Sequence, residues 1–264
     1  MLRRAARTLV RTFGYDIVRW PARSPSGGGP RPPLPDGVVS QPPPGVGAID
    51  FGSLRSLEPV SRVFGLDRGT SIVRHYIDEF LRAHHTVLAG RILEVAEARY
   101  AKALGARDAQ IDVLFPRAGH PGTTVIGDLA TGVGIPLGAF DAIILTQVLP
   151  HIYAIKEAIG VVHRALKPGG VVLATFPGVA QVSRFDMDRW GDYWRVTDLA
   201  ARRLFEESFA APSVVVNTYG NVLSAMAALS GAAAEELTQL ELAHRDPDYP
   251  ILIGVLARKT PGPV

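Results

Sequence analysis

The hydrophobic positions of this chain follow two alternating patterns from about residue 51 onward. Short continuous apolar runs, typical of strands buried on both faces, alternate with stretches whose apolar side chains recur every three or four residues, as in helices. The runs lie at 92–95, 111–115, 124–126, 140–145, 171–176, 214–218 and 250–256, and the helical stretches at 71–88, 98–104, 153–166, 197–209 and 221–241. This alternation predicts a mostly parallel seven-stranded sheet with helices on both faces, which would bind ligands at the carboxyl ends of its strands.

The first fifty residues have a different composition. In residues 1–20, apolar side chains such as Leu2, Leu9 and Phe13 recur at helical spacing with arginines between them, which predicts a basic amphipathic helix. Residues 21–50 are rich in proline and glycine and predict an extended linker. We therefore expect the folded domain to span residues 51–260.

The basic arm at 1–20 has two interpretations. Residues 1–40 hold seven arginines against two aspartates, so the arm could lie on an anionic membrane surface. Alternatively, it packs on the body of the protein or on a partner. Separately, the chain could form a homo-oligomer. No apolar run approaches the roughly 20 residues that a membrane-spanning helix needs. The expected location is the cytoplasm, with peripheral contact at the inner membrane surface.

Charge and residue types exclude several classes of function. Outside residues 1–40 the chain is slightly acidic, which argues against a nucleic-acid track across the main domain. The chain has no cysteine, so thiolate zinc sites and cysteine nucleophiles are excluded, and we predict no metal site. The sequence also contains no Gly-x-Ser-x-Gly elbow, Walker loop or His-Glu-x-x-His helix.

The segment 140–177 carries a more specific signal. It reads FDAIILTQVLPHIYAIKEAIGVVHRALKPGGVVLATFP: Phe-Asp, a buried strand, a loop with a histidine, an amphipathic helix, then Leu-Lys-Pro-Gly-Gly and another strand. This order resembles the central part of class I S-adenosylmethionine-dependent methyltransferases, and the resemblance extends over residues 60–258. It implies a Rossmann-like α/β fold with S-adenosylmethionine as cofactor. Phrases at 64–69, 190–194, 219–222 and 244–250 resemble methyltransferase-like proteins associated with glycan or secondary-metabolite biosynthesis.

The resemblance implies cofactor-binding residues after the first and third strands. Glu94 matches the acid at the end of the first strand, and Asp128, followed by Leu129, matches the acid that contacts the adenine amino group. Asp128 has a second interpretation as the cap of a helix or turn.

Two positions depart from the family pattern. The glycine-rich loop after the first strand holds Ala96, Ala98 and Tyr100 at its three glycine positions. A non-glycine residue at a position that needs a positive φ costs about 1 kcal/mol or more. The ribose-binding acid expected at 115–117 is missing, and Asp112 comes too early in the strand.

His151, in the loop after the fourth strand, is the candidate catalytic base. Methyl transfer from a sulfonium requires positioning of the acceptor and removal of its proton, for which the ordinary pKa of histidine is suitable. The alternative is that His151 only binds the loop backbone through a hydrogen bond.

Two further groups of residues are candidates for the substrate site. Trp190, Asp192, Tyr193 and Trp194 follow the fifth strand, and rings with carboxylates suit a sugar or polyol. The alternative is that the two tryptophans cover the edge of the sheet. Asp67 and Arg68, from the N-terminal part of the domain, either reach the same cleft or form a surface ion pair; these six residues complete the predicted site.

The sequence thus predicts a methyltransferase that transfers a methyl group from S-adenosylmethionine to oxygen or nitrogen of a sugar, glycan intermediate or small natural product. The rival hypothesis is a non-catalytic or repurposed methyltransferase-like protein that has lost the cofactor and serves as a partner of a glycan-biosynthesis enzyme. The altered loop and the missing second-strand acid motivate this rival.

Overall fold

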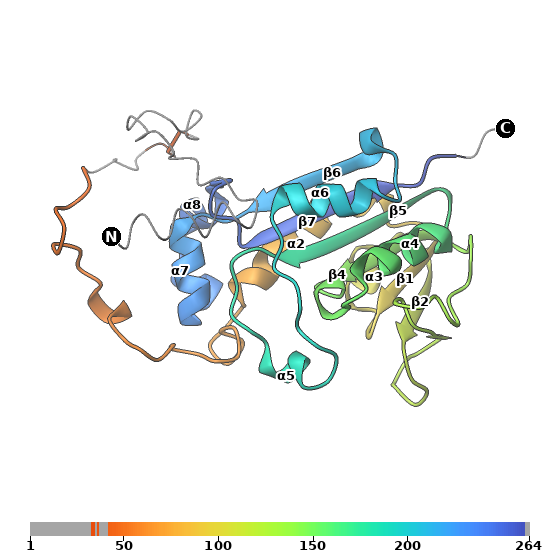
Figure 1. The fold of residues 1–264 in the computed structure, drawn as a ribbon, viewed down its shortest axis with the longest axis horizontal. Helices are drawn as coiled ribbons and strands as arrows, with labels where there is room; N and C mark the ends of the chain where they lie inside the picture. The colour runs from red at the N-terminus through yellow and green to blue at the C-terminus, as the bar shows by residue number, and fades with distance from the viewer. Residues whose placement is uncertain (1–32, 35, 37–41, 262–264) are drawn as a thin grey trace, which may run out of the picture. The chain divides into compact units, whose positions relative to one another are not determined.

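A computed structural model describes residues 33–34, 36 and 42–261 (Figure 1). The chain divides into two units, residues 1–33 and 34–264, and the description below concerns the second. The predicted amphipathic helix at 1–20 and most of the linker before residue 42 lie outside the described residues. Among the helices that are described, none is long and apolar enough to cross a membrane.

Seven strands form one sheet in the order β3-β2-β1-β4-β5-β7-β6 (Figure 1). The strands are β1 Arg91–Val95, β2 Gln110–Phe115, β3 Val125–Ile126, β4 Phe140–Thr146, β5 Leu166–Pro177, β6 Val214–Tyr219 and β7 Leu252–Arg258. The pairs from β3 through β5 are parallel, whereas β7 runs antiparallel to both β5 and β6. The predicted Rossmann-like sheet is confirmed.

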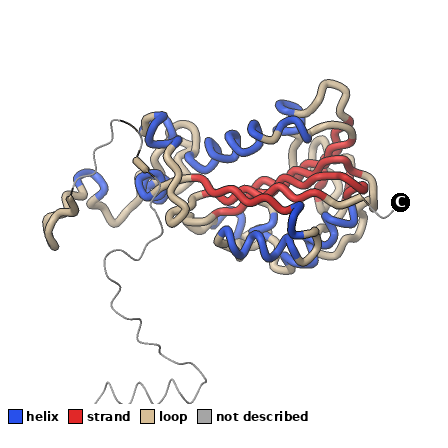
Figure 2. Tube along the Cα trace, turned by 90° about the horizontal axis from the view of Figure 1, so that it is seen from above, coloured by secondary structure: helices blue, strands red, loops and turns tan. Residues whose placement is uncertain are grey.

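Helices cover both faces of the sheet, as Figure 2 shows. They are α2 Ile72–Ala83, α3 Arg99–Leu104, α4 Ile155–Ala165, α5 Arg184–Met187, α6 Asp198–Glu206, α7 Val222–Ser230 and α8 Gln239–Ala243. Helices α4 and α6 pack against one face through residues such as Ile159 and Phe205, and α2, α3, α7 and α8 pack against the other through residues such as Phe80. Along β4, Ile143 and Ile144 face opposite cores, which explains the continuous apolar run.

The prediction of one helix over 221–241 is wrong. Helix α7 ends at Ser230 because Gly231 adopts a left-handed conformation (φ 82°) next to the backbone of Ser61, where a Cβ would collide. A short 3-10 turn and helix α8 follow. The predicted helix 71–88 likewise stops at Ala83 and continues only as a short 3-10 turn at His85–Val87.

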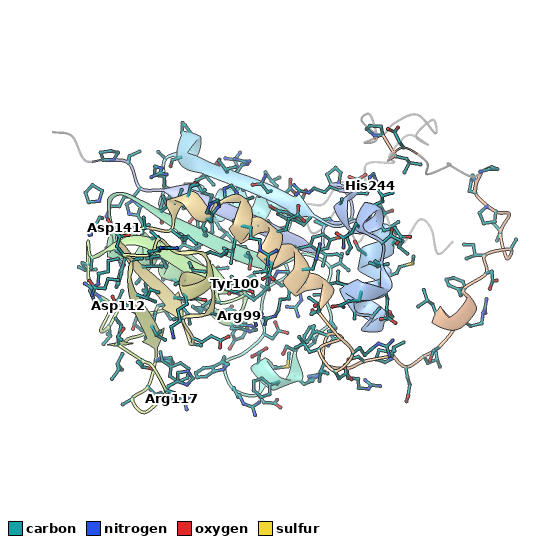
Figure 3. The ribbon with its side chains drawn as sticks, turned by 180° about the vertical axis from the view of Figure 1, so that it is seen from behind. Arg99, Tyr100, Asp112, Arg117, Asp141 and His244 are labelled. Carbon is teal, nitrogen blue, oxygen red and sulfur yellow. The ribbon has the colours of Figure 1, made fainter. Side chains whose placement is uncertain are left out.

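The Phe-Asp and Lys-Pro-Gly-Gly motifs meet at the amino ends of β4 and β5. The Asp141 carboxylate accepts hydrogen bonds from the Arg91 amide (2.7 Å) and the Lys167 ammonium (2.6 Å), so it ties β1, β4 and β5 together. Phe140 pairs with Leu166 and Ala142 with Val171, so the expected turn is a bulge within β5. These residues lie at the opposite end of the sheet from the ligand-binding edge, and in Figure 3 Asp141 is far from Arg117, which follows β2.

We expect Asp141→Asn to destabilise the fold by about 1 kcal/mol at pH 7, since this partly exposed carboxylate makes two charge-assisted hydrogen bonds. Burial alone would raise the pKa of Asp141, but the Arg91 amide and Lys167 outweigh it and lower the pKa below its ordinary value. The stabilisation is therefore fully present at pH values above the ordinary pKa near 3.8. It is lost as the pH falls through the lower pKa that Asp141 has in the folded protein. Urea titrations between pH 2 and 7 measure this difference.

The control for this prediction is Asp108→Asn, an exposed carboxylate just before β2. It should change the free energy of unfolding by less than about 0.5 kcal/mol. A loss for Asp141→Asn that stays constant down to pH 2 would contradict the role of its charge.

Candidate functional site

A pocket of about 220 Å³ opens at the carboxyl ends of β4 and β5. Its walls come from residues 64–77, which lead into and form the start of α2, from the loop after β4, and from the loop between β5 and α6. The neighbouring strands β1 and β4 connect onward in opposite directions along the sheet, and open α/β sheets bind ligands at such a switch point. The pocket therefore lies where the fold class places a ligand.

His151 lines this pocket in a fixed orientation. It ends a short 3-10 turn, Leu149–His151, and its Nδ1 lies 2.8 Å from the carbonyl oxygen of Gly191. A carbonyl oxygen only accepts, so Nδ1 carries the proton and Nε2 of the neutral ring keeps its lone pair. The backbone hydrogen bond and a role as base thus use different nitrogens of the same ring.

Asp192 also lines the pocket, but its carboxylate is bound by the protein. Both oxygens lie 2.7 Å from the guanidinium nitrogens of Arg195, and one accepts the Ser183 amide at 2.8 Å. The hydrogen bonds from Arg195 lower the pKa of Asp192, although burial opposes them. Asp192 therefore remains ionised and fixes the loop that positions Gly191 and, through it, His151.

The aromatic residues predicted for the substrate site separate into two groups. Trp190 packs edge-on against Phe115 at the end of β2, with ring centroids 5.7 Å apart, and Arg117 lies over its ring at 5.1 Å. Tyr193 and Trp194 instead contact the exposed Tyr153, with centroids at 5.4 and 6.0 Å. The two tryptophans do not cover one common surface.

Asp67 and Arg68 do not line the pocket. The Asp67 carboxylate accepts a hydrogen bond from the Ser61 hydroxyl at 2.5 Å. Arg68 forms an ion pair with Glu236 at 2.5 Å, and both side chains are more than a third exposed. Arg68 thus forms a surface ion pair, but with Glu236 and not with Asp67 as the sequence interpretation supposed.

Two polar residues of the pocket, Arg74 and Gln147, were not among the candidates from the sequence. Arg74, on α2, lies 3.4 Å from the hydroxyl of Tyr100, and no carboxylate of the described residues forms an ion pair with it. Gln147, after β4, has φ 55°, and its backbone amide donates a hydrogen bond to Thr175 Oγ1 at 3.1 Å. A cation next to the apolar face of an amphipathic helix was the signal that could have identified Arg74.

Glu94 shapes the loop after β1. Its carboxylate is almost completely buried and accepts hydrogen bonds from the amides of Tyr100 (3.0 Å) and Ala101 (2.7 Å), the first turn of α3. Burial raises the pKa of Glu94, and these two amides act against that rise. Glu94 therefore fixes the loop between β1 and α3 by binding backbone amides of the protein itself.

The three expected glycine positions adopt different conformations. Ala96 has φ 68°, in the left-handed region, whereas Ala98 has φ −89°. Tyr100 is buried in the core between α2 and the sheet. Of these three residues, only Ala96 is therefore strained, by the roughly 1–2 kcal/mol that the left-handed conformation costs an L-residue.

No acid stands at the carboxyl end of β2. Phe115 ends the strand, and the ring of His120 stacks on it with centroids 3.8 Å apart, while its Nε2 lies 2.7 Å from the carbonyl oxygen of Ala96. Asp112 lies farther up the strand from Arg117 (Figure 3) and is paired with Arg91 at 2.7 Å. As expected, Asp112 is too early to reach this edge.

The acid after β3 lies in a turn of its own. The Asp128 carboxylate is exposed and accepts hydrogen bonds from the Ala130 amide (2.8 Å) and the Thr131 hydroxyl (3.1 Å). Leu129 is buried in the core. Neither residue lines the pocket, and within the described part of the chain no cluster of three potential metal ligands occurs.

Comparison with known proteins finds one matching family model. Residues 61–174, from just before α2 to the middle of β5, match the family of methyltransferase domains. The strand order with an antiparallel β7 is that of the class I methyltransferase fold. No curated protein matches the chain significantly.

Solved structures with similar folds share little sequence with this chain. A methyltransferase from Archaeoglobus fulgidus, described as dependent on S-adenosylmethionine, is 12% identical over 70% of this chain and 94% of its own, with a TM-score of 0.46. A Thermotoga maritima methyltransferase, described as a possible histamine N-methyltransferase, is 15% identical over 72% and 92% (TM-score 0.46). A Haemonchus contortus phosphoethanolamine N-methyltransferase bound to S-adenosylmethionine is 13% identical over 70% and 53% (TM-score 0.47).

Ala96→Gly should stabilise the protein by about 0.5–1 kcal/mol, because the relief of the left-handed strain exceeds the entropy that glycine adds to the unfolded chain. The matched control is Ala103→Gly, on the exposed side of α3, which should destabilise by about the same amount. Thermal and urea unfolding of both variants measure whether each substitution raises or lowers the free energy of unfolding. A stability loss in Ala96→Gly would show that Ala96 is not strained.

Proposed function

We propose that the protein is an S-adenosylmethionine-dependent methyltransferase that methylates oxygen or nitrogen of a sugar, glycan intermediate or small natural product. One observation carries the proposal. A single pocket at the ligand-binding edge of the sheet contains Arg74, a cation without an ion-pair partner among the described residues, and His151, whose Nε2 is left with its lone pair. The match of residues 61–174 to methyltransferase domains supports it.

The pocket fits one end of the cofactor. Its volume of about 220 Å³ is below the range of roughly 300–1,000 Å³ for sites that hold a whole small molecule. It suits the methionine moiety and the reacting atoms, and Arg74 would hold the methionine carboxylate. The nucleoside would then lie outside the pocket, over the loop from Ala96 to Tyr100. When bound, the cofactor supplies a methyl group on a positively charged sulfur.

The chain's own residues handle the proton of the acceptor. Nε2 of His151 accepts the proton of the acceptor hydroxyl or amine, while the Gly191 carbonyl holds Nδ1. Asp192, held by Arg195 and the Ser183 amide, fixes the loop that carries Gly191 and so keeps the His151 ring in place. The imidazolium then releases the proton to solvent.

The surroundings of the pocket support a hydroxyl-rich or ring-containing acceptor. Gln181 and Ser183 give the wall polar groups, and Asp186 accepts a hydrogen bond from the Ser183 hydroxyl at 2.6 Å. The rings of Tyr153 and Tyr193, close by after β4 and β5, are 72% and 50% exposed. Exposed ring faces of this kind can stack on the apolar face of a sugar.

The residues at the carboxyl end of β2 favour a second candidate function, that of a protein without the cofactor. Phe115 stands where a ribose-binding acid is expected, and His120 lies stacked on it. Both support the rival hypothesis of a non-catalytic or repurposed protein that acts as a partner of a glycan-biosynthesis enzyme. Cofactor binding separates the two candidates.

Calorimetric titration with S-adenosylmethionine and S-adenosylhomocysteine tests whether the protein binds the cofactor and whether Arg74 contributes to binding. We expect saturable one-site binding to the wild type, weakened about 10- to 100-fold in Arg74→Ala because an ionic hydrogen-bond partner of the carboxylate is lost. Arg82→Ala, on the exposed side of the same helix, is the control and should bind as the wild type does. No binding to the wild type up to millimolar ligand would favour the second candidate.

Activity tests His151 separately from binding. With an acceptor found by S-adenosylhomocysteine release in extracts of the source, His151→Asn should lower kcat by about 10²- to 10⁴-fold. Its affinity for S-adenosylhomocysteine should stay within about twofold of the wild type. An unchanged kcat would remove His151 from the mechanism.

For residues 1–20 we propose contact with an anionic membrane surface. Deletion of these residues should leave the thermal unfolding of the domain unchanged and weaken sedimentation with phosphatidylserine vesicles, since each basic residue near such a surface contributes about 1 kcal/mol. Vesicles of neutral lipid are the control. Equal sedimentation with and without the segment would contradict the proposal.

A further inference from the structure

The loop between β2 and β3 spans residues 116–124. Its last residue, Thr124, is fixed to β2 by hydrogen bonds with Val113 and Asp112, whereas residues 116–122 are attached to the rest of the protein by few contacts. We call residues 116–122 the β2–β3 flap. Over residues 116–122, the hydrogen bond to the rest of the described chain is the one between His120 Nε2 and the Ala96 carbonyl oxygen, at 2.7 Å. The ring of His120 also stacks on Phe115, and Arg117 lies over Trp190 at 5.1 Å.

The ring of His120 lies at the edge where a nucleoside would bind. In nucleotide-binding α/β sheets the ribose lies at the carboxyl end of the second strand, next to the loop after the first. His120 touches both places here, since it stacks on Phe115 at the end of β2 and reaches the backbone of Ala96 just after β1. A ribose at this position would need the space that the imidazole occupies.

We propose that the β2–β3 flap is an autoinhibitory element in which His120 competes with the nucleoside part of the cofactor. Binding requires His120 to leave Phe115 and the Ala96 carbonyl, so the flap swings outward when the ligand enters. This inference rests on the proposed function, because it takes the nucleoside of S-adenosylmethionine as the competing group.

The backbone of the flap allows such a movement. Gly119 (φ 90°) and Gly122 (φ 77°) flank His120, and a Cβ at either position would have no heavy atom within 4 Å. The hydroxyl of Thr123 is buried without a hydrogen-bond partner in the described structure. An unsatisfied buried hydroxyl directly after the flap makes the closed arrangement less stable than a fully hydrogen-bonded one.

The first experiment compares the affinity of S-adenosylhomocysteine for His120 variants by calorimetry. His120→Ala removes both the stack and the hydrogen bond, so it should bind about tenfold more tightly than the wild type, because a larger fraction of molecules is open. His120→Phe keeps a ring on Phe115 but loses the hydrogen bond, and its affinity should lie between the two. His85→Ala, an exposed histidine remote from the flap, is the control and should not change the affinity.

The second experiment detects the flap itself through limited trypsin digestion after Arg117. Bound ligands usually protect a protein, but here saturating S-adenosylhomocysteine should accelerate cleavage after Arg117 in the wild type, because the ligand holds the flap open. His120→Ala should be cleaved faster than the wild type even without ligand. Cleavage after Arg245, which pairs with Glu79 away from the flap, serves as the internal control.

The outcomes separate the two proposals. If the wild type binds S-adenosylhomocysteine and His120→Ala binds equally or more weakly, the flap proposal is overturned while cofactor binding stands. Slower cleavage after Arg117 with ligand overturns it as well, since the flap would then be closed in the complex. If neither the wild type nor His120→Ala binds the ligand, the proposed function fails and the competition fails with it.

Discussion

The buried carboxylate of Glu94 determines the shape of the ligand-binding edge next to β1. It cannot remain in the core without partners, and it obtains them from the amides of Tyr100 and Ala101 at the start of α3. The chain must therefore turn sharply between β1 and α3, which gives Ala96 its left-handed φ and directs its carbonyl oxygen toward His120. The same turn places the hydroxyl of Tyr100 next to Arg74 in the pocket. One interaction thus connects the strained loop, the flap and the pocket cation.

The sequence predicted the fold better than it predicted the site. The Phe-Asp and Lys-Pro-Gly-Gly motifs were the most specific signal, and the structure explains them by the bonds of Asp141 to Arg91 and Lys167. These bonds join strands at the amino end of the sheet. They identify the architecture of the domain and contain no information about the ligand at the other end.

Residues that line the pocket were predictable where they follow a strand directly. His151 was predicted because the end of a buried strand fixes where the next loop starts, and it lines the pocket; its role as a base stays a prediction. Arg74 and His120 were missed because their positions depend on tertiary packing: one lies beside the apolar face of a helix, the other on a nine-residue loop folded back onto β1. The prediction of one helix over 221–241 was wrong for a similar reason, since Gly231 ends the helix where Ser61 packs closely.

The separation of the two tryptophans has a practical consequence. Trp190 contacts Phe115 at the carboxyl end of β2, whereas Trp194 lies with Tyr153 beside the loop that carries His151. The indole nitrogen of Trp194 donates to the Ile152 carbonyl at 3.1 Å. The protein therefore has an intrinsic fluorophore at each end of its candidate site. With one indole replaced at a time, and Trp20 replaced throughout, emission spectra can report the occupancy of each end independently in unlabelled protein.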